Sequence, residues 1–168
     1  MNDLIMRKAT INDYDAYYRI KCDPKNVEWS GFLTPPNYIK LKSRFNAFFD
    51  CERQHLFLFE SHDIVIGYLN LHILDDGLCI ETSHGAISRH NIKSLGSKML
   101  NSVIQYIERD NTFFQARYMI GWVAESNIAS IQNVLKNRYK STDEVEYRQI
   151  NGNNEKFVKY KRRIGVNE

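Results

Sequence analysis

"SRHNIKSLGSKML", residues 88–100, passes from a polar loop into an amphipathic helix, and a single glycine, Gly96, stands near the join. Backbone amides at the start of a helix have no partner within the helix, and the helix dipole adds partial positive charge there. An anion therefore binds well at such a position. Lys93 adds a full charge, and Ser94 and Ser97 add hydroxyl groups. The stretch predicts either a phosphate-binding loop or an ordinary start of a surface helix.

Two common nucleotide-binding motifs are missing from the chain. A dinucleotide fingerprint needs GxGxxG directly after the first strand, and a P-loop needs GxxxxGK[ST]. Neither string occurs in the 168 residues. If residues 88–100 bind a phosphate, they do so without either of these two motifs.

The hydrophobic pattern on both sides of this stretch predicts a single α/β domain over residues 1–168. Strands are expected at 4–10, 55–61, 64–74, 78–88, 116–124, 144–150 and 155–164, and helices at 12–22, 35–50, from within 88–100 to about 107, and at 126–137. Residues 23–36 are expected to be irregular. The three consecutive strands predict an antiparallel meander, and the later strand–helix–strand unit requires a parallel crossover. We therefore expect a mixed, mostly antiparallel sheet with helices on both faces.

Composition excludes several classes of protein. Hydrophobic residues make up 43% and charged residues 26%, which is ordinary for a globular domain. No apolar run approaches the roughly 18 residues of a membrane span, and the N-terminus lacks the apolar core of a signal peptide. These features predict a cytoplasmic protein with no membrane partner. The three cysteines and five histidines have no metal-ligand spacing, so free thiols and no metal are expected.

Positive charge is concentrated near the end of the chain. The net charge is +3, and the segment "KFVKYKRR" at 156–163 holds five basic residues in eight. This segment could contact nucleic acid or a phosphorylated ligand, or it could be a solvated edge strand protected against aggregation. The modest net charge and the lack of a basic–aromatic repeat disfavour a nucleic-acid partner.

The stretch 88–100 resembles the coenzyme A loop of the GCN5-related N-acetyltransferase (GNAT) superfamily. That loop reads approximately Arg/Gln-x-x-Gly-x-Gly/Ala between a strand and a helix. Gly96 falls on its last glycine, Asn91 on the Arg/Gln position and Ser94 on the earlier glycine. One glycine and the arginine are therefore missing, but backbone amides are the hydrogen-bond donors in this loop.

A second stretch, "WVAESNIASIQNVLKNRYKST" at 122–142, resembles the GNAT segment in which a strand ends at an Asn and a helix follows. Asn127 and Ser130 match the Asn-x-x-Ser/Ala of that family. Asn137 stands near the place of a usual glycine, and asparagine can adopt its left-handed conformation. An ordinary helix cap at Asn127 would explain the local sequence equally well.

The resemblance implies direct transfer of an acetyl group from acetyl-coenzyme A (acetyl-CoA), a co-substrate, to a primary amine in a ternary complex. In such a fold the two central strands splay apart, and backbone N–H groups of residues 85–88 would hold the pantetheine and polarise the thioester carbonyl. The implied cofactor-binding residues are Ala86, Ile87, Ser88, Asn91, Ile92, Lys93, Ser94, Leu95, Gly96, Ser97, Asn127 and Ser130.

Two residues before the loop are candidates for the base that deprotonates the amine. Glu81 lies on the strand leading to the loop and would act directly or through water, provided that burial raises its pKa. His84 has the more suitable intrinsic pKa and would share this task or line the acceptor pocket. Either could also be an ordinary polar strand residue. The tyrosine with which this family often protonates the thiolate is replaced by Val134, and Tyr139 is the next tyrosine, so no acid is assigned.

Acceptor specificity in this fold comes largely from the first two helices and their connection. The connection holds "EWSGF" at 28–32, in which Trp29 and Phe32 could stack on a sugar or a ring, or could simply cover the core. We expect a small-molecule amine such as an amino sugar, free or nucleotide-linked. Acetylation of a protein or peptide N-terminus and a catalytically degenerate CoA-binding module are alternatives. Both a monomer and a homodimer fit the sequence.

Overall fold

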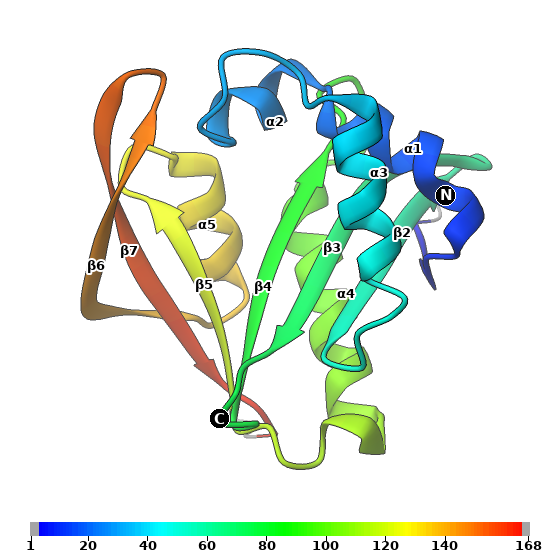
Figure 1. The fold of residues 1–168 in the computed structure, drawn as a ribbon. Coiled ribbons are helices and arrows are strands. Elements are labelled where there is room, and N and C mark those ends of the chain that lie inside the picture. Colours follow the sequence, from blue (N-terminus) through cyan, green and yellow to red (C-terminus); the bar gives the residue numbers. More distant parts are fainter. Residues whose placement is uncertain (1–3, 166–168) are drawn as a thin grey trace.

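The computed structural model describes residues 4–165 and contains a seven-stranded sheet in the order β1-β2-β3-β4-β5-β7-β6, with helices on both faces (Figure 1). The strands are β1 (Ile5–Lys8), β2 (Gln54–Ser61), β3 (Ile64–Ile73), β4 (Cys79–Ala86), β5 (Tyr118–Ala124), β6 (Lys140–Ile150) and β7 (Asn153–Arg163). The helices are α1 (Tyr14–Lys21), α2 (Pro24–Trp29), α3 (Tyr38–Ala47), α4 (Leu95–Arg109) and α5 (Ile128–Lys136), with short 3-10 turns at Ile11–Asp13 and Asn111–Phe113. Neighbouring strands are antiparallel except for β4 and β5, which are parallel. The expected mixed, mostly antiparallel sheet is confirmed.

Helices α4 and α5 cover one face of the sheet, and α1 and α3 cover the other (Figure 1). The apolar stripe of α4 is buried as its spacing predicts, and it packs against Leu69, Leu71 and Ile80 of β3 and β4. The buried residues of that stripe are Leu95, Met99, Leu100, Val103, Ile104 and Ile107. Because α4 lies flat on the sheet, its N-terminus is held beside the end of β4.

An aromatic cluster fixes α1 and α3 on the opposite face. Tyr17 makes an edge contact with Tyr68 of β3, with ring centroids 5.0 Å apart, and it also contacts Phe45 of α3 at 5.2 Å. Aromatic pairs of this kind contribute about 0.5–1.5 kcal/mol beyond their buried area. The cluster places Lys21, the last residue of α1, next to Tyr68 and near the end of β4.

The segment expected to be irregular contains a helix, α2. The carboxylate of Asp23 accepts a hydrogen bond from Lys25 N–H (3.1 Å), and Pro24 occupies the first turn, where its missing N–H costs nothing. Asp23 also accepts from Ser88 N–H (2.7 Å), so the start of α2 is joined to the end of β4. A local cap and one long-range contact together stabilise a helix of only two turns.

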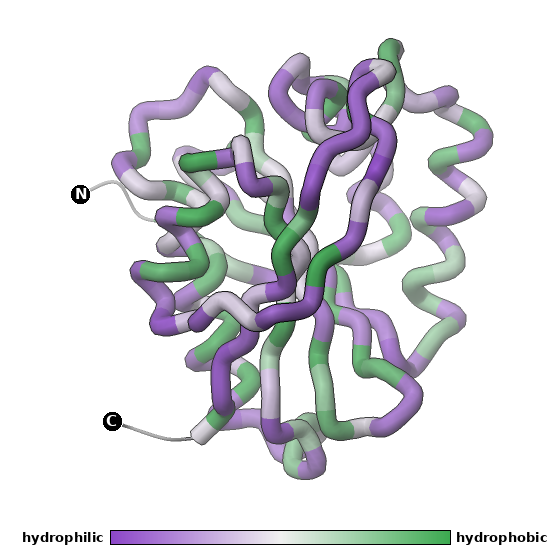
Figure 2. Tube along the Cα trace, turned by 90° about the vertical axis from the view of Figure 1, so that its left-hand side faces the viewer, coloured by the Kyte–Doolittle hydropathy of each residue, from purple (hydrophilic) through white to green (hydrophobic). Residues whose placement is uncertain are grey.

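Helix α5 and the C-terminal hairpin also differ from the sequence prediction. The helical spacing of Ile128, Ile131, Val134 and Leu135 predicts that all four face inward, but Ile128 and Leu135 are 60% and 53% exposed, and Val134 is the buried residue of α5. Strand β6 begins at Lys140, before the predicted start at residue 144. It is the edge of the sheet, and most of the β6–β7 hairpin is hydrophilic (Figure 2).

The basic segment 156–163 is part of β7, which lies between β5 and β6 and is therefore not an edge strand. Its charges are largely paired within the protein: Lys156 with Glu125 (3.0 Å), Lys159 with Glu144 (2.8 Å) and Arg162 with Glu108 (3.1 Å). This pairing leaves little positive charge on β7 for a nucleic-acid partner.

An ion-pair network at the other edge of the sheet predicts sensitivity to acid. Arg7 donates two hydrogen bonds to Asp13 (2.7 and 2.8 Å) and one to Glu60 (2.7 Å). The two bonds from Arg7 to Asp13 are the main reason why the pKa of Asp13 is lowered to about 2. A carboxylate whose pKa falls on folding stabilises the protein above its unfolded pKa near 4, and this contribution disappears as the pH falls toward 2. Asp13→Asn should lower the free energy of unfolding by about 1–2 kcal/mol near pH 7 and by little near pH 2. Urea unfolding at both pH values checks this.

Asp75→Asn is the matched control, because Asp75 pairs with Arg53 on the surface with a fully exposed side chain. Such a pair contributes little to stability. An equal loss of stability in both variants near pH 7 would contradict the role given to Asp13.

Candidate active site

The two parallel strands part after a short paired segment and leave a cleft between them. Strands β4 and β5 pair only from Cys79 to Glu81, opposite Tyr118–Ile120, and then diverge toward α2 (Figure 1). At the point of divergence the Thr82 hydroxyl donates to the carbonyl oxygen of Ile120 (3.3 Å), replacing a ladder bond from β4. Strand β5 stays paired with β7 along its whole length. The cleft has a volume of about 590 Å³ and is lined by both strands, α2, the first turns of α4 and α5, and the β6–β7 hairpin.

The N-terminus of α4 forms one end of this cleft and is open toward an anion. Ser94 occupies the N-cap position in a left-handed conformation (φ 55°) and makes no side-chain cap, so the first amides of α4 are not satisfied by it. Its hydroxyl instead accepts a hydrogen bond from Lys136 Nζ (3.2 Å) at the end of α5. A lysine beside a helix N-terminus is opposed by the helix dipole unless an anion lies between them. The open amides and this charge fit the phosphate groups of a coenzyme A ester.

Gly96 lies at a close approach between two helices. A Cβ atom at Gly96 would lie 2.3 Å from Nδ2 of Asn133 in α5. The Asn137 side-chain amide also joins the helices, because it donates to the Ser97 carbonyl oxygen (3.0 Å). The backbone of α4 therefore passes directly against α5 at the end of the cleft.

The structure brings seven of the twelve predicted cofactor-binding residues to the cleft. These are Ala86, Ile87, Ser88, Leu95, Gly96, Asn127 and Ser130. The other five are not among its lining residues: Asn91, Ile92, Lys93, Ser94 and Ser97. Ile92 is 5% exposed with its side chain in the core, so it can offer a ligand only its backbone.

The amides of residues 85–88 are not all available to a ligand. Ile87 N–H donates to Ile66 O (2.9 Å), and Ser88 N–H donates to Asp23 (2.7 Å). Burial tends to raise the pKa of Asp23, but the hydrogen bonds from Ser88 and Lys25 outweigh it and lower that pKa, so Asp23 keeps its charge. Amides in an antiparallel pair alternate in direction, so Ala86 N–H points away from β3 and toward the cleft.

The two candidate bases lie on opposite faces of β4. His84 lines the cleft, and loss of solvent there lowers its pKa. Glu81 occupies the last paired position, opposite His72 of β3 and Ile120 of β5, and is not among the residues lining the cleft. Residues three apart on a strand point to opposite faces, so the two side chains do not converge.

At α5, Asn127 is an ordinary helix cap and also a cleft residue: its side chain accepts from Ser130 N–H (3.2 Å). Asn137 does not adopt the expected left-handed conformation (φ −95°); Arg138 does (φ 61°). This turn places Tyr139, which is 2% exposed, beside Thr82 in the core, and burial raises the pKa of its phenol. The Tyr139 hydroxyl has no hydrogen-bond partner of good geometry in the described chain.

The opposite end of the cleft is formed by α2 and the hairpin. Asn26 joins α2 to its surroundings by donating to Ile20 O (2.7 Å) and Ala86 O (3.0 Å). Trp29 lines the cleft as predicted, whereas Phe32 is 61% exposed and is not a lining residue. Sequence reasoning missed the other members of this end, which come together only in the fold: Lys21, Lys25, Tyr68, Trp122, Arg148 and Phe157.

Parted parallel strands beside an open helix N-terminus are the architecture expected of a GNAT-type transferase. The family model described as "Acetyltransferase (GNAT) domain" matches residues 3–140. The chain therefore belongs to the GNAT acetyltransferase family, and both the resemblance and the class of enzyme are confirmed. Among curated proteins no significant match is found. No helix within residues 4–165 has both the length and the apolar character to cross a bilayer.

Several solved structures share this fold at low sequence identity. Spermidine N-acetyltransferase from Vibrio cholerae, in complex with CoA and spermine, has a TM-score of 0.81 at 15% identity, over 95% of each chain. A phosphinothricin acetyltransferase from Sinorhizobium meliloti, in complex with acetyl-CoA, has a TM-score of 0.77 at 16% identity, over 96% of this chain and 89% of that one. Ribosomal-protein-alanine N-acetyltransferase from Brucella melitensis has a TM-score of 0.78 at 15% identity, over 95% of this chain and 99% of that one. Acetyl-CoA, the expected co-substrate, is thus bound by a protein of this fold.

Proposed function

We propose that this protein transfers the acetyl group of acetyl-CoA directly to the primary amine of a small molecule such as an amino sugar, free or nucleotide-linked. One observation carries the proposal: a single cleft joins the open N-terminus of α4 to an aromatic end at α2 and the hairpin. An acetyl donor and an amine held at these two ends meet between β4 and β5. Direct transfer follows from that proximity.

The first amides of α4, with Lys93 and Lys136, hold the phosphate groups of acetyl-CoA. Asn127 and Ser130 line the pantetheine arm, and Ala86 N–H donates to the thioester carbonyl. When bound, acetyl-CoA supplies an activated acetyl group. The protein residues fix its position and polarise its carbonyl.

His84 accepts the proton that the amine loses before attack. It lines the cleft, and its lowered pKa keeps the imidazole neutral and able to accept a proton at neutral pH. Glu81 is not among the residues that line the cleft, so any contribution from its carboxylate passes through water. Trp29 stacks on the acceptor, and Phe32 contacts the outer part of a larger acceptor.

A panel of amines tests the proposal. Purified protein with acetyl-CoA is mixed with amino sugars, their phosphates and nucleotide-linked forms, amino acids, spermidine and an alanine-terminated peptide, and free CoA thiol is measured. Thiol release with a small amine is the expected result. Release with the peptide alone would replace the small-molecule acceptor by a protein N-terminus. Tight acetyl-CoA binding without thiol release from any amine would indicate a degenerate CoA-binding module.

A further inference from the structure

The acceptor end of the cleft has an unbalanced charge. Lys21, Lys25 and Arg148 line this end, whereas no Asp or Glu is among the lining residues of the described chain. From this imbalance, and resting on the proposed function, we infer that the acceptor amine carries a negatively charged group, a phosphate or a carboxylate. Lys21 is the main residue that binds this group.

Lys21 is a cation without a carboxylate partner. Its ammonium donates to the Tyr68 hydroxyl (3.2 Å) and lies 5.4 Å from the centroid of the Tyr68 ring. Burial raises the pKa of Tyr68 to about 12, so this partner is a neutral phenol. No carboxylate within residues 4–165 lies within ion-pair distance of Lys21. The neutral phenol does not neutralise the charge of this half-buried ammonium, so an anionic group of the ligand can balance it.

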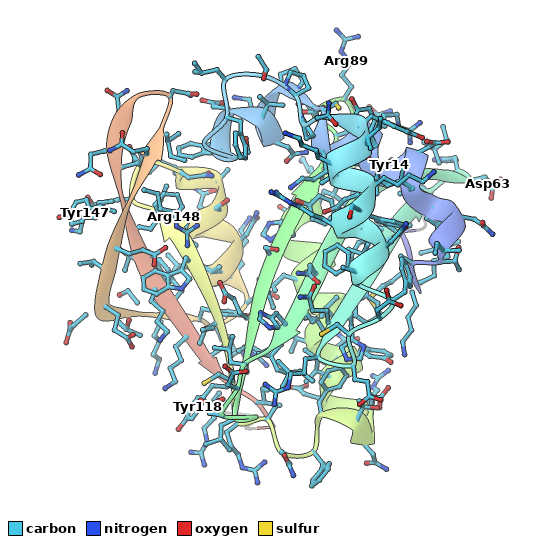
Figure 3. All side chains as sticks on the ribbon, viewed as in Figure 1. Tyr14, Asp63, Arg89, Tyr118, Tyr147 and Arg148 are labelled. Atoms are coloured by element: carbon cyan, nitrogen blue, oxygen red, sulfur yellow. The ribbon has the colours of Figure 1, made fainter. Side chains whose placement is uncertain are left out.

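The other two cations are already paired and assist Lys21. Lys25 is exposed and lies 3.6 Å from Glu28. Arg148 is bound to Glu146, and its guanidinium stacks over the Phe157 ring at 4.3 Å. Figure 3 shows Arg148 directed from β6 toward the cleft side of the sheet, while its neighbour Tyr147 points outward. Arg148 is thereby held flat at the edge of the pocket.

The phosphate groups of acetyl-CoA do not account for these cations. Helices α1 and α3 lie on the face of the sheet opposite α4 and α5, and α2 covers the open end of the cleft (Figure 1). Lys21 ends α1 and Lys25 lies in α2, whereas the open amides belong to the first turn of α4. The acceptor end therefore has its own positive charge.

Both tryptophans contribute to an apolar part of the lining of this end. Trp29 and Trp122 pack around Ala124 and Phe157 in a small cluster. Such a surface accommodates the body of a small amine, and the cations bind its anionic group. A polyamine, which carries only positive charge, would meet repulsion from Lys21, and no Asp or Glu lines this end to bind it.

Both tryptophans of the chain line the cleft, so their indole N–H signals report binding directly. Protein saturated with CoA, which occupies the α4 end without turnover, is titrated at constant ionic strength with O-phosphoethanolamine, β-alanine, ethanolamine and spermidine. We expect saturable shifts of the indole N–H signals with one or both anionic amines. Ethanolamine and spermidine should cause no shift. The stronger of the two anionic probes identifies phosphate or carboxylate. Two results would overturn the inference. One is an equal or stronger shift with ethanolamine or spermidine, and the other is no shift with either anionic amine at millimolar concentration.

Lys21→Gln should weaken binding of the anionic probe by about 10-fold or more, since a hydrogen bond to a charged group contributes about 1.5–3 kcal/mol. Lys42→Gln is the matched control, because Lys42 is exposed on α3 and lies over the Tyr14 ring (5.8 Å) in a similar way. It should bind the probe as the native protein does. Equal weakening in both variants, or none in Lys21→Gln, would contradict the role of Lys21.

Failure of the inference is distinguishable from failure of the proposed function. Thiol release with neutral or cationic amines but not with anionic ones would reject the anionic acceptor and retain the acetyltransferase. Absence of acetyl-CoA binding in native protein would reject the acetyltransferase. Lys21→Gln should retain full acetyl-CoA binding, because Lys21 ends α1 on the face of the sheet opposite α4.

Discussion

Gly96→Trp is expected to abolish the stabilisation of the protein by acetyl-CoA. A ligand present at 100 times its Kd stabilises the native state by about 2.7 kcal/mol, which corresponds to roughly 5–10 °C in Tm for a chain of this size. A Cβ atom at Gly96 already lies 2.3 Å from Asn133, so an indole there must displace Asn133 and occupy the end of the cleft. Thermal unfolding with and without acetyl-CoA should show a rise in Tm for the native protein and no change in Tm for the variant.

Two further variants separate loss of binding from loss of fold. Gln105→Trp places the same bulk on an exposed site of α4, away from the cleft, and should keep the full shift. Gly96→Ala combined with Asn133→Ala relieves the close contact and should bind acetyl-CoA better than Gly96→Trp. A full shift in Gly96→Trp would show that the start of α4 is an ordinary turn and not a phosphate-binding loop.

The arrangement of strands could be predicted because it depends on local patterns. Alternation identified the meander of β2, β3 and β4, and the stripe of α4 matched the face that is buried. The surroundings of an amphipathic helix, in contrast, depend on distant parts of the chain and do not follow from the sequence of the helix itself. Helix α5 contacts the core through Ile131 and Val134, so Ile128 and Leu135 remain exposed even though their spacing is that of a buried face.

The same distinction explains which site residues could be predicted. The start of α4 is one continuous segment, and its sequence fits either an anion site or an ordinary helix start. Lys136 approaches Ser94 from a distant part of the chain, and Lys21 and Arg148 meet only because α1 and β6 border one cleft. Alternation could not decide between Glu81 and His84, because residues three apart on a strand face opposite ways and the pattern does not say which face borders the cleft.

His84→Gln is expected to lower kcat by about 10²–10⁴-fold, the usual contribution of a positioned general base. In the native protein kcat should rise with pH as the imidazole loses its proton. The midpoint should lie below the ordinary histidine value of 6.5, because loss of solvent in the cleft lowers the pKa of His84. Glutamine cannot accept that proton, so the acid limb of the pH profile should disappear in the variant.

Glu81→Gln is the comparison that makes this result interpretable. If the cleft residue His84 is the base, the Glu81 variant should retain most of kcat and the full acid limb, because Glu81 is not among the residues that line the cleft. Both variants should keep the native thermal shift with acetyl-CoA, which excludes a loss of binding as the cause. A large loss of kcat in Glu81→Gln and a small one in His84→Gln would instead assign the base to Glu81 acting through water.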